Sequence, residues 1–265
     1  MPTDVTAETS AELLAAFADT STDAILGGKL ILRQPLRGHR FGHDAILLAA
    51  ATSAAAGDRA VELGAGVGAA GLALAKRVPG LAVTLVDIDP ALTGLARGNA
   101  ERNGLAERVR VACLDVAAPD AAFAAAGLAA QAIDCMLMNP PFNPADNPSP
   151  EPARRRARIA PDDALRRWLG TAARLLRPGG TLTLIWRADR LAELLAALVS
   201  DFGAVSLLPV YGKPEAPAIR VLARAIKGSR GPLTLHPGLL LTDAQGRPTD
   251  AAEAVLRRGA VLPLG

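Results

Sequence analysis

The stretch Asn139-Pro140-Pro141-Phe142 places chemically capable groups directly after an apolar run, IDCMLM. The Asn139 side-chain oxygen and the Pro140 carbonyl can each accept a hydrogen bond from an NH2 group. Proline fixes φ, so the direction of that carbonyl is set in advance. Phe142 can stack on a flat partner such as a nucleobase. These residues form a candidate site for a planar nitrogen, and a simple proline turn with a surface phenylalanine is the alternative.

A glycine-rich stretch, VELGAGVGAAG, lies between a strand pattern and a helical pattern. Glycines there let the backbone turn sharply and approach a ligand at a helix N-terminus. Gly66, Gly68 and Gly71 fit the G-x-G-x-x-G spacing of dinucleotide sites. Gly64, Gly66 and Gly68, preceded by Glu62, resemble instead the G-x-G-x-G pattern of S-adenosylmethionine (SAM) methyltransferases. Tight packing of a strand on a helix, without a ligand, is the third interpretation.

Acidic residues end the next two strand patterns. Asp87 closes VTLVD, and a carboxylate there can accept hydrogen bonds from both hydroxyls of a ribose. Asp115 closes VRVACLD, a position that in a SAM enzyme meets the adenine amino group. Ile88 and Val116, which follow these acids, are expected to join the cofactor site. Asp89 stands before a proline and is expected to cap a helix.

The pattern along the chain predicts an α/β fold. From about residue 58, short β-rich runs alternate with helical stretches, which favours a mostly parallel sheet with helices on both faces. VSLLPVY and AIRVLARAIK near the end are expected to pair as an antiparallel C-terminal hairpin. Residues 1–57 are expected to form an N-terminal extension of a short helix, a β-hairpin turning at Gly27-Gly28 and a second helix. Residues 58–265 form the main domain, and the whole is expected to be one compact unit.

The length, composition and net charge of the chain exclude some classes of protein. The chain has 265 residues, 50% of them hydrophobic, and a net charge of only +3, which by itself supports no partner. Cys113 and Cys135 lie in apolar runs and are expected to be buried free thiols, as in a reducing cytosol. No apolar run reaches the ~18 residues that cross a membrane, and the N-terminus is acidic where a signal peptide is basic. A soluble, cytoplasmic protein is expected.

Taken together, these motifs resemble one enzyme family. Asn-Pro-Pro-Phe after an apolar strand resembles the signature of SAM-dependent methyltransferases that act on planar nitrogens. The segments LRGHRFGHDAILLAA, LGAGVGAAGLALA, RLLRPGG and AIRVLARAIKGSRGPLTLHPGLLLTD extend the resemblance to residues 25–260. The chain is thereby similar to the bacterial tRNA1(Val) adenine-37 N6-methyltransferases. This resemblance implies a Rossmann-like class I methyltransferase fold with a seven-stranded sheet.

The resemblance also implies a reaction. SAM would donate a methyl group to the exocyclic N6 of an adenine in tRNA, leaving S-adenosylhomocysteine. Asn139 and Pro140 would hold the NH2 group and stabilise its developing positive charge. Arg40 and Phe41, in a segment that folds over the cofactor, would contact its methionine end. Methylation of a protein glutamine and guanine-N2 methylation of ribosomal RNA are alternatives. DNA adenine methylation and a SAM-fold binding module without activity fit the sequence less well.

Basic residues near the motif indicate an RNA partner. Arginines occupy four of five successive positions, which are Arg154, Arg155, Arg156 and Arg158. Beside the target-nitrogen site they are expected to bind phosphates, and a solvated basic face is the alternative. Arg220, Arg224, Lys227 and Arg230 are candidates to extend this patch. His39 and His43 lack a third ligand, so no metal is expected, and no obligate protein partner is evident.

Overall fold

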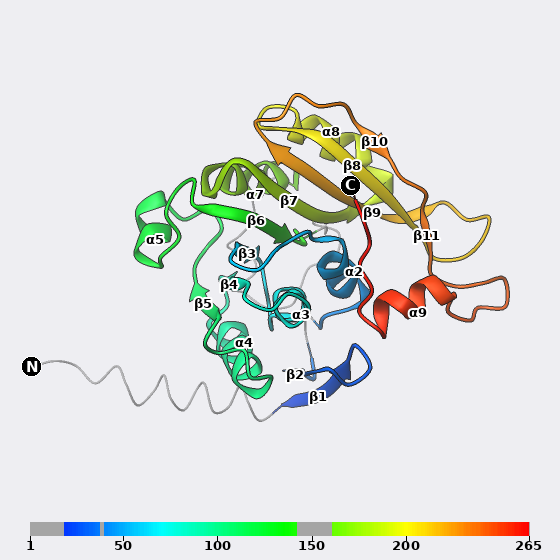
Figure 1. Ribbon diagram of the computed structural model, residues 1–265, viewed down its shortest axis with the longest axis horizontal. Coiled ribbons are helices and arrows are strands. Elements are labelled where there is room, and N and C mark those ends of the chain that lie inside the picture. The colour runs from blue at the N-terminus through cyan, green and yellow to red at the C-terminus, as the bar shows by residue number, and fades with distance from the viewer. Residues whose placement is uncertain (1–18, 38–39, 142–160, 265) are drawn as a thin grey trace, which may run out of the picture.

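A computed structural model describes residues 19–37, 40–141 and 161–264. Its main feature within these ranges is a nine-stranded sheet with helices on both faces (Figure 1). The strands are, in chain order, β3 (Arg59–Leu63), β4 (Ala82–Asp87), β5 (Val109–Cys113), β6 (Ile133–Met138), β7 (Leu176–Arg187), β8 (Phe202–Tyr211), β9 (Ala218–Lys227), β10 (Thr234–Leu235) and β11 (Leu239–Leu240).

Neighbouring strands of the sheet run mostly in the same direction. β5, β4, β3, β6 and β7 are parallel neighbours in that spatial order. β9 is antiparallel to both β7 and β8, so β8 and β9 form the expected C-terminal hairpin. The predicted fold class is therefore confirmed. The two short strands β10 and β11, which pair with β8, extend the seven predicted strands.

Helices cover both faces of this sheet, which explains why the strand sequences are apolar throughout. One face carries α2 (His43–Ala51), α3 (Ala69–Arg77), α4 (Pro90–Arg102) and α9 (Asp250–Leu256). The other face carries α5 (Asp120–Ala125), α7 (Pro161–Leu175) and α8 (Leu191–Leu198), with the 3-10 turn η1 (Ala188–Arg190) before α8. The sheet thus has a hydrophobic core on each face, and the side chains of β3 and β6 point to the two faces alternately. Ala60 of β3 packs in one core and Leu63 of β3 packs in the other.

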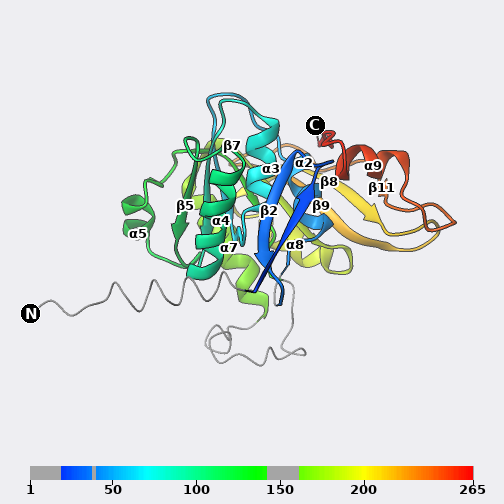
Figure 2. The same ribbon diagram turned by 90° about the horizontal axis from the view of Figure 1, so that it is seen from below.

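A separate hairpin precedes the sheet. β1 (Thr20–Ile25) and β2 (Leu30–Pro35) pair antiparallel. The turn between them contains Gly27 at φ 65° and Gly28 at φ 86°, which is the left-handed region that glycine adopts without strain. The predicted hairpin is thus confirmed. Figure 2 shows it lying beside α4 rather than joining the main sheet.

Asn99 of α4 and Asn103, the C-cap residue of that helix, hold this hairpin through hydrogen bonds to its backbone. Asn103 accepts from Ile31 N at 2.8 Å and donates to Ile31 O at 2.7 Å. Asn99 does the same with Arg33, at 2.7 and 2.9 Å. Four helical residues rise about 6 Å, close to the length of two strand residues. The two amides therefore act as a partner strand for the free edge of β2, a feature that the sequence reading did not predict.

Two sequence expectations need correction. Cys135 is buried as expected, but Cys113 is exposed, because it ends the edge strand β5. Next to this sheet, Asp44 in the first turn of α2 forms an ion pair with Arg220 at 2.9 Å. Lys227 donates to Leu176 O at the start of β7, at the sheet edge opposite Asn139. It therefore does not extend a basic patch near that residue.

In the described ranges, no helix combines the length and the apolar character needed to cross a membrane.

The asparagine contacts predict a stability effect. Asn103→Ala should lower the free energy of unfolding by about 1–3 kcal/mol, because it leaves the Ile31 N–H and carbonyl without these partners. Urea unfolding followed by circular dichroism measures this. Glu101→Ala, at an exposed position of the same helix, is the matched control and should change stability by less than about 0.5 kcal/mol. Equal stabilities of the two variants would contradict the role given to Asn103.

Candidate active site

The ends of three parallel strands meet at one edge of the sheet. Leu63, the last residue of β3, pairs with Val86 of β4 on one side and with Met138 of β6 on the other. The next residue along each strand is therefore Gly64, Asp87 or Asn139. Open α/β sheets bind ligands at this carboxyl edge. The register alone brings the glycine loop, one predicted ribose-binding acid and the Asn-Pro-Pro motif together.

The glycine loop adopts a backbone that other residues resist. Gly64, Gly66 and Gly68 have φ values of 67°, 55° and 86°. Gly68 is the N-cap of α3, and a Cβ there would lie 2.7 Å from Leu85 Cδ1. A Cβ on Gly66 would meet nothing within 4 Å. The loop is therefore closely packed at Gly68 and open at Gly66, which leaves room for a ligand beside the helix N-terminus.

Asp87 holds the glycine loop against β4. Its Oδ2 accepts a hydrogen bond from Gly66 N at 2.7 Å, and its Oδ1 accepts from Asp89 N at 2.9 Å. Each carboxylate oxygen retains a further lone pair, which can accept from a ribose hydroxyl. Asp89 accepts from Ala91 N and Leu92 N and caps α4, so the prediction of a helix cap is confirmed.

Glu62 is buried beneath the same loop. Only 5% of its surface is exposed, and its Oε2 accepts a hydrogen bond from Gly71 N at 2.7 Å. Burial raises the pKa of Glu62 to about 8, and the nearby Asp87 carboxylate adds to that rise, against the opposing effect of the Gly71 N–H. The group is therefore largely protonated at neutral pH unless a cation approaches it.

The neighbouring strand ends supply the other expected cofactor residues. Ile88 is an apolar side chain with 61% of its surface exposed, at the rim of the edge just described. Asp115 is exposed and accepts from Ala117 N at 2.8 Å, while Val116 is buried. An exposed isoleucine beside two carboxylates suits a flat heterocycle attached to a ribose. Their roles as cofactor contacts stay predictions.

The Asn-Pro-Pro motif ends β6 with an unsatisfied acceptor. The Asn139 Oδ1 atom is buried and has no hydrogen-bond partner among the described residues. Pro140 is buried and Pro141 is exposed. A buried polar atom without a partner costs free energy, so this oxygen is suited to a donor that arrives with a ligand. Phe142 and the four arginines, Arg154, Arg155, Arg156 and Arg158, lie outside the described residues.

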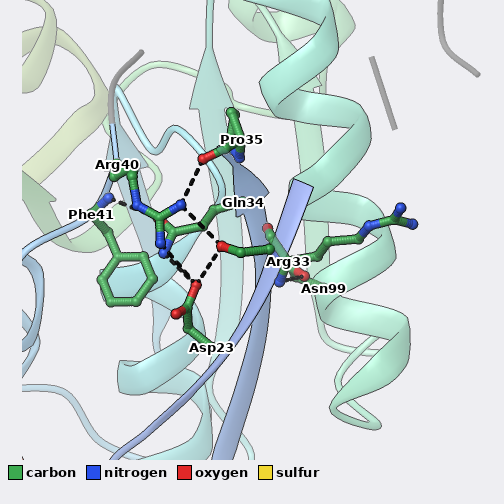
Figure 3. A network of polar contacts seen from close by, with 8 residues as sticks. Asp23, Arg33, Gln34, Pro35, Arg40, Phe41 and Asn99 are labelled. Carbon is green, nitrogen blue, oxygen red and sulfur yellow. Dashed lines mark hydrogen bonds and ion pairs between the residues drawn. The ribbon is translucent and has the colours of Figure 1, made fainter. Parts of the chain in front are cut away.

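Arg40 and Phe41 belong to a polar network on the N-terminal hairpin (Figure 3). Arg40 pairs with Asp23 at 3.1 Å and donates to Pro35 O at 2.9 Å. Gln34, which is buried, donates to the same Asp23 carboxylate and accepts from Phe41 N. The Arg40 guanidinium is thus bound to the hairpin, and this pairing does not favour a contact with the cofactor. That contact stays a prediction.

The comparisons with known proteins agree with this arrangement. Residues 41–210, more than half of the chain, match the family described as methyltransferase small domain. The chain belongs to this family. The structure is similar to that of a predicted O-methyltransferase from Agrobacterium tumefaciens, with 30% identity, a TM-score of 0.70, and coverage of 83% of this chain and 98% of the other.

Two curated relatives have more specific names. A tRNA1(Val) (adenine(37)-N6)-methyltransferase of Porphyromonas gingivalis is 33% identical over 159 residues, covering 58% of this chain and 61% of its own. A release factor glutamine methyltransferase of Gloeobacter violaceus is 36% identical over 155 residues, covering 55% and 51%. The matched region thus spans about half to three fifths of each relative.

Membership of this family makes SAM the cofactor of the protein, and the residues at this sheet edge fit that molecule. The open side of Gly66, the free lone pairs of Asp87 and the exposed Ile88 suit its ribose and adenine. No cluster of three or more metal-ligating side chains occurs in the described ranges.

The sequence analysis did not predict some residues that shape the site. Asn99 donates to Val67 O in the glycine loop at 3.0 Å in addition to holding β2. Its signal was present, since asparagine is a poor helix former and Asn99 lies inside a helical pattern. Trp168 of α7 packs against the core and also reaches Gly64.

The environment of Glu62 predicts a pH dependence. Its pKa is near 4.5 when unfolded and about 8 when folded. Between these values the folded state binds more protons, so this group's contribution to stability falls as the pH rises. The free energy of unfolding of the wild type, measured relative to Glu62→Gln, should fall by on the order of 3 kcal/mol between pH 5.5 and 8. Urea titrations at both pH values test this. A difference that does not change with pH would contradict it.

Proposed function

We propose that the protein transfers the methyl group of SAM to the exocyclic N6 of an adenine in tRNA, most favourably in the anticodon-loop region. Membership of the methyltransferase family supports the reaction class. The name of the Porphyromonas gingivalis relative supports the substrate. The observation that carries the proposal is the buried Asn139 oxygen, which has no hydrogen-bond partner among the described residues and follows the strand beside the glycine loop.

Asn139 and Pro140 would position the target nitrogen. The lone pair of an aromatic NH2 group is delocalised, so the nitrogen is a weak nucleophile. The Asn139 Oδ1 and the Pro140 carbonyl would each accept a hydrogen bond from one N–H of this group. These bonds would orient the nitrogen lone pair and stabilise the positive charge that develops on the nitrogen. SAM, when bound, supplies an electrophilic methyl group and leaves as S-adenosylhomocysteine. The methylated nitrogen is strongly acidic and would lose its proton to water, so no general base is required.

The remaining predicted residues would have separate tasks. Asp87 and Ile88 would hold the ribose and adenine, with Asp115 and Val116 at the far end of the adenine. Glu62 would lie near the methionine end, where the cofactor's ammonium would favour its ionised form. Phe142 would stack on the base, and the arginines from Arg154 to Arg158 would bind RNA phosphates. A tRNA substrate would place the reaction in the cytoplasm, and the reaction needs no metal and no protein partner.

A protein glutamine is the second candidate substrate. The Gloeobacter violaceus relative bears this activity in its name, and a glutamine amide offers the same planar NH2 group to Asn139.

A transfer assay distinguishes these substrates. The purified protein would receive tritiated SAM together with unmodified total tRNA, ribosomal RNA or release factors in parallel reactions, followed by nucleoside mass spectrometry. N6-methyladenosine in tRNA is the expected product. Label in release factor, or N2-methylguanosine in ribosomal RNA, would keep the Asn-Pro-Pro chemistry but replace the substrate. Label in an oxygen-linked methyl group would contradict the role of Asn139.

Asn139→Ala is the matched variant for this assay. Transfer should fall at least about 100-fold, because an acceptor for the developing charge is removed. The dissociation constant for SAM, measured by calorimetry, should change by less than about twofold, because this acceptor acts on the substrate. Loss of SAM binding would show that Asn139 contacts the cofactor and would contradict its proposed contact with the substrate.

A further inference from the structure

Trp168 reaches from α7 into the glycine loop. A Cβ placed on Gly64 would lie 2.2 Å from its Cη2 atom and 2.9 Å from its Cζ3 atom. The end of the six-membered ring therefore rests directly against Gly64. Trp168 packs partly against the core beneath α7 and keeps part of its surface exposed. A tryptophan that only filled the core would not need to reach the first glycine of a ligand loop.

The helix that carries this indole is fixed on both sides of the site. Thr171, one turn beyond Trp168, is buried, and its Oγ1 donates to Val116 O at 2.8 Å. Residues three apart lie on the same side of a helix. One side of α7 therefore contacts both the glycine loop and the loop after β5, and the position of the indole is determined by two contacts.

The glycine that the indole contacts neighbours the Asn-Pro-Pro motif. Leu63 and Met138 are paired, so Gly64 and Asn139 are the next residues on neighbouring strands. Asn139 is the residue proposed to hold the methyl acceptor. A ring that rests on Gly64 is consequently close to the place where methyl donor and acceptor must meet.

We propose that the Trp168 indole contacts the positively charged sulfonium end of SAM and favours the cofactor over its neutral product. Aromatic faces attract cations within about 6 Å, and tryptophan does so most strongly. The sulfonium charge is present before transfer and absent from S-adenosylhomocysteine. An aromatic ring at this position thus holds the substrate form of the cofactor more tightly than the spent form. This inference rests on the proposed use of SAM, but not on the identity of the methyl acceptor.

Calorimetric titration of SAM and of S-adenosylhomocysteine into the wild type, Trp168→Phe and Trp168→Leu tests the proposal. Trp168→Leu should weaken SAM binding roughly three- to thirty-fold and product binding by less than about twofold. Trp168→Phe, which retains an aromatic face, should give an intermediate loss of SAM affinity. Thermal unfolding of each variant shows whether it is folded.

Tryptophan fluorescence gives a second readout, because the chain has two tryptophans and the other, Trp186, is buried with 3% of its surface exposed. SAM should change the emission of Trp186→Phe, in which only Trp168 emits. It should leave the emission of Trp168→Phe nearly unchanged.

Three results would overturn the inference. Equal weakening of SAM and product would make Trp168 a packing residue. Unchanged affinity for both, with a raised KM for RNA, would assign the ring to the acceptor. If the wild type binds neither SAM nor S-adenosylhomocysteine, the proposed function itself is contradicted. The other two results leave the proposed function intact.

Discussion

The parallel pairing of β3 with β4 on one side and with β6 on the other is the constraint on which the site depends. This register sets the glycine loop, Asp87 and Asn139 at the ends of three adjacent strands. A shift of one residue in any of these strands would turn its buried side chains to the opposite face. The apolar strands are enclosed by helices on both faces, so the packing of the core fixes the geometry of the edge.

Hydrogen bonds then link the loops at this edge to one another. Asp87 accepts from Gly66 N, and Asn99 donates to Val67 O while it also binds β2. Thr171 ties α7 to the loop that follows β5. The cofactor site is therefore supported from α4, α7 and the N-terminal hairpin at once. Each support is a contact between a buried or half-buried side chain and the backbone, which positions the loops before any ligand binds.

The sequence predicted much of this arrangement because its signals are local. Alternation of strand and helix patterns gave the sheet, and positions of glycine and proline gave the turn at Gly27-Gly28 and the cap at Asp89. The spacing of glycines and acids at strand ends indicated which residues would share an edge. The contacts between distant segments were not predictable in this way. Asn99 and Asn103 reach a hairpin some 70 residues earlier in the chain, and no local pattern identifies their partners.

The exposure of Cys113 and the ion pair of Asp44 likewise depend on contacts between distant segments. Cys113 has apolar neighbours in the chain, but its strand lies at the edge of the sheet and its thiol is exposed. Asp44 lies in the first turn of α2 and pairs there with Arg220, a residue of β9 far away in the chain. Both outcomes depend on which strand lies beside which element. That neighbourhood is determined by the whole fold.

The central claim is that this sheet edge is a SAM-binding site organised by Asp87. Calorimetric titration of S-adenosylhomocysteine into the wild type, Asp87→Asn and the control Asp89→Asn tests it most directly. Asparagine caps a helix about as well as aspartate, so Asp89→Asn should bind normally. Asp87→Asn should bind at least about tenfold more weakly, because the charged acceptor for Gly66 N–H and the ribose is lost. Equal affinities for all three proteins, with unfolding temperatures unchanged, would contradict the account.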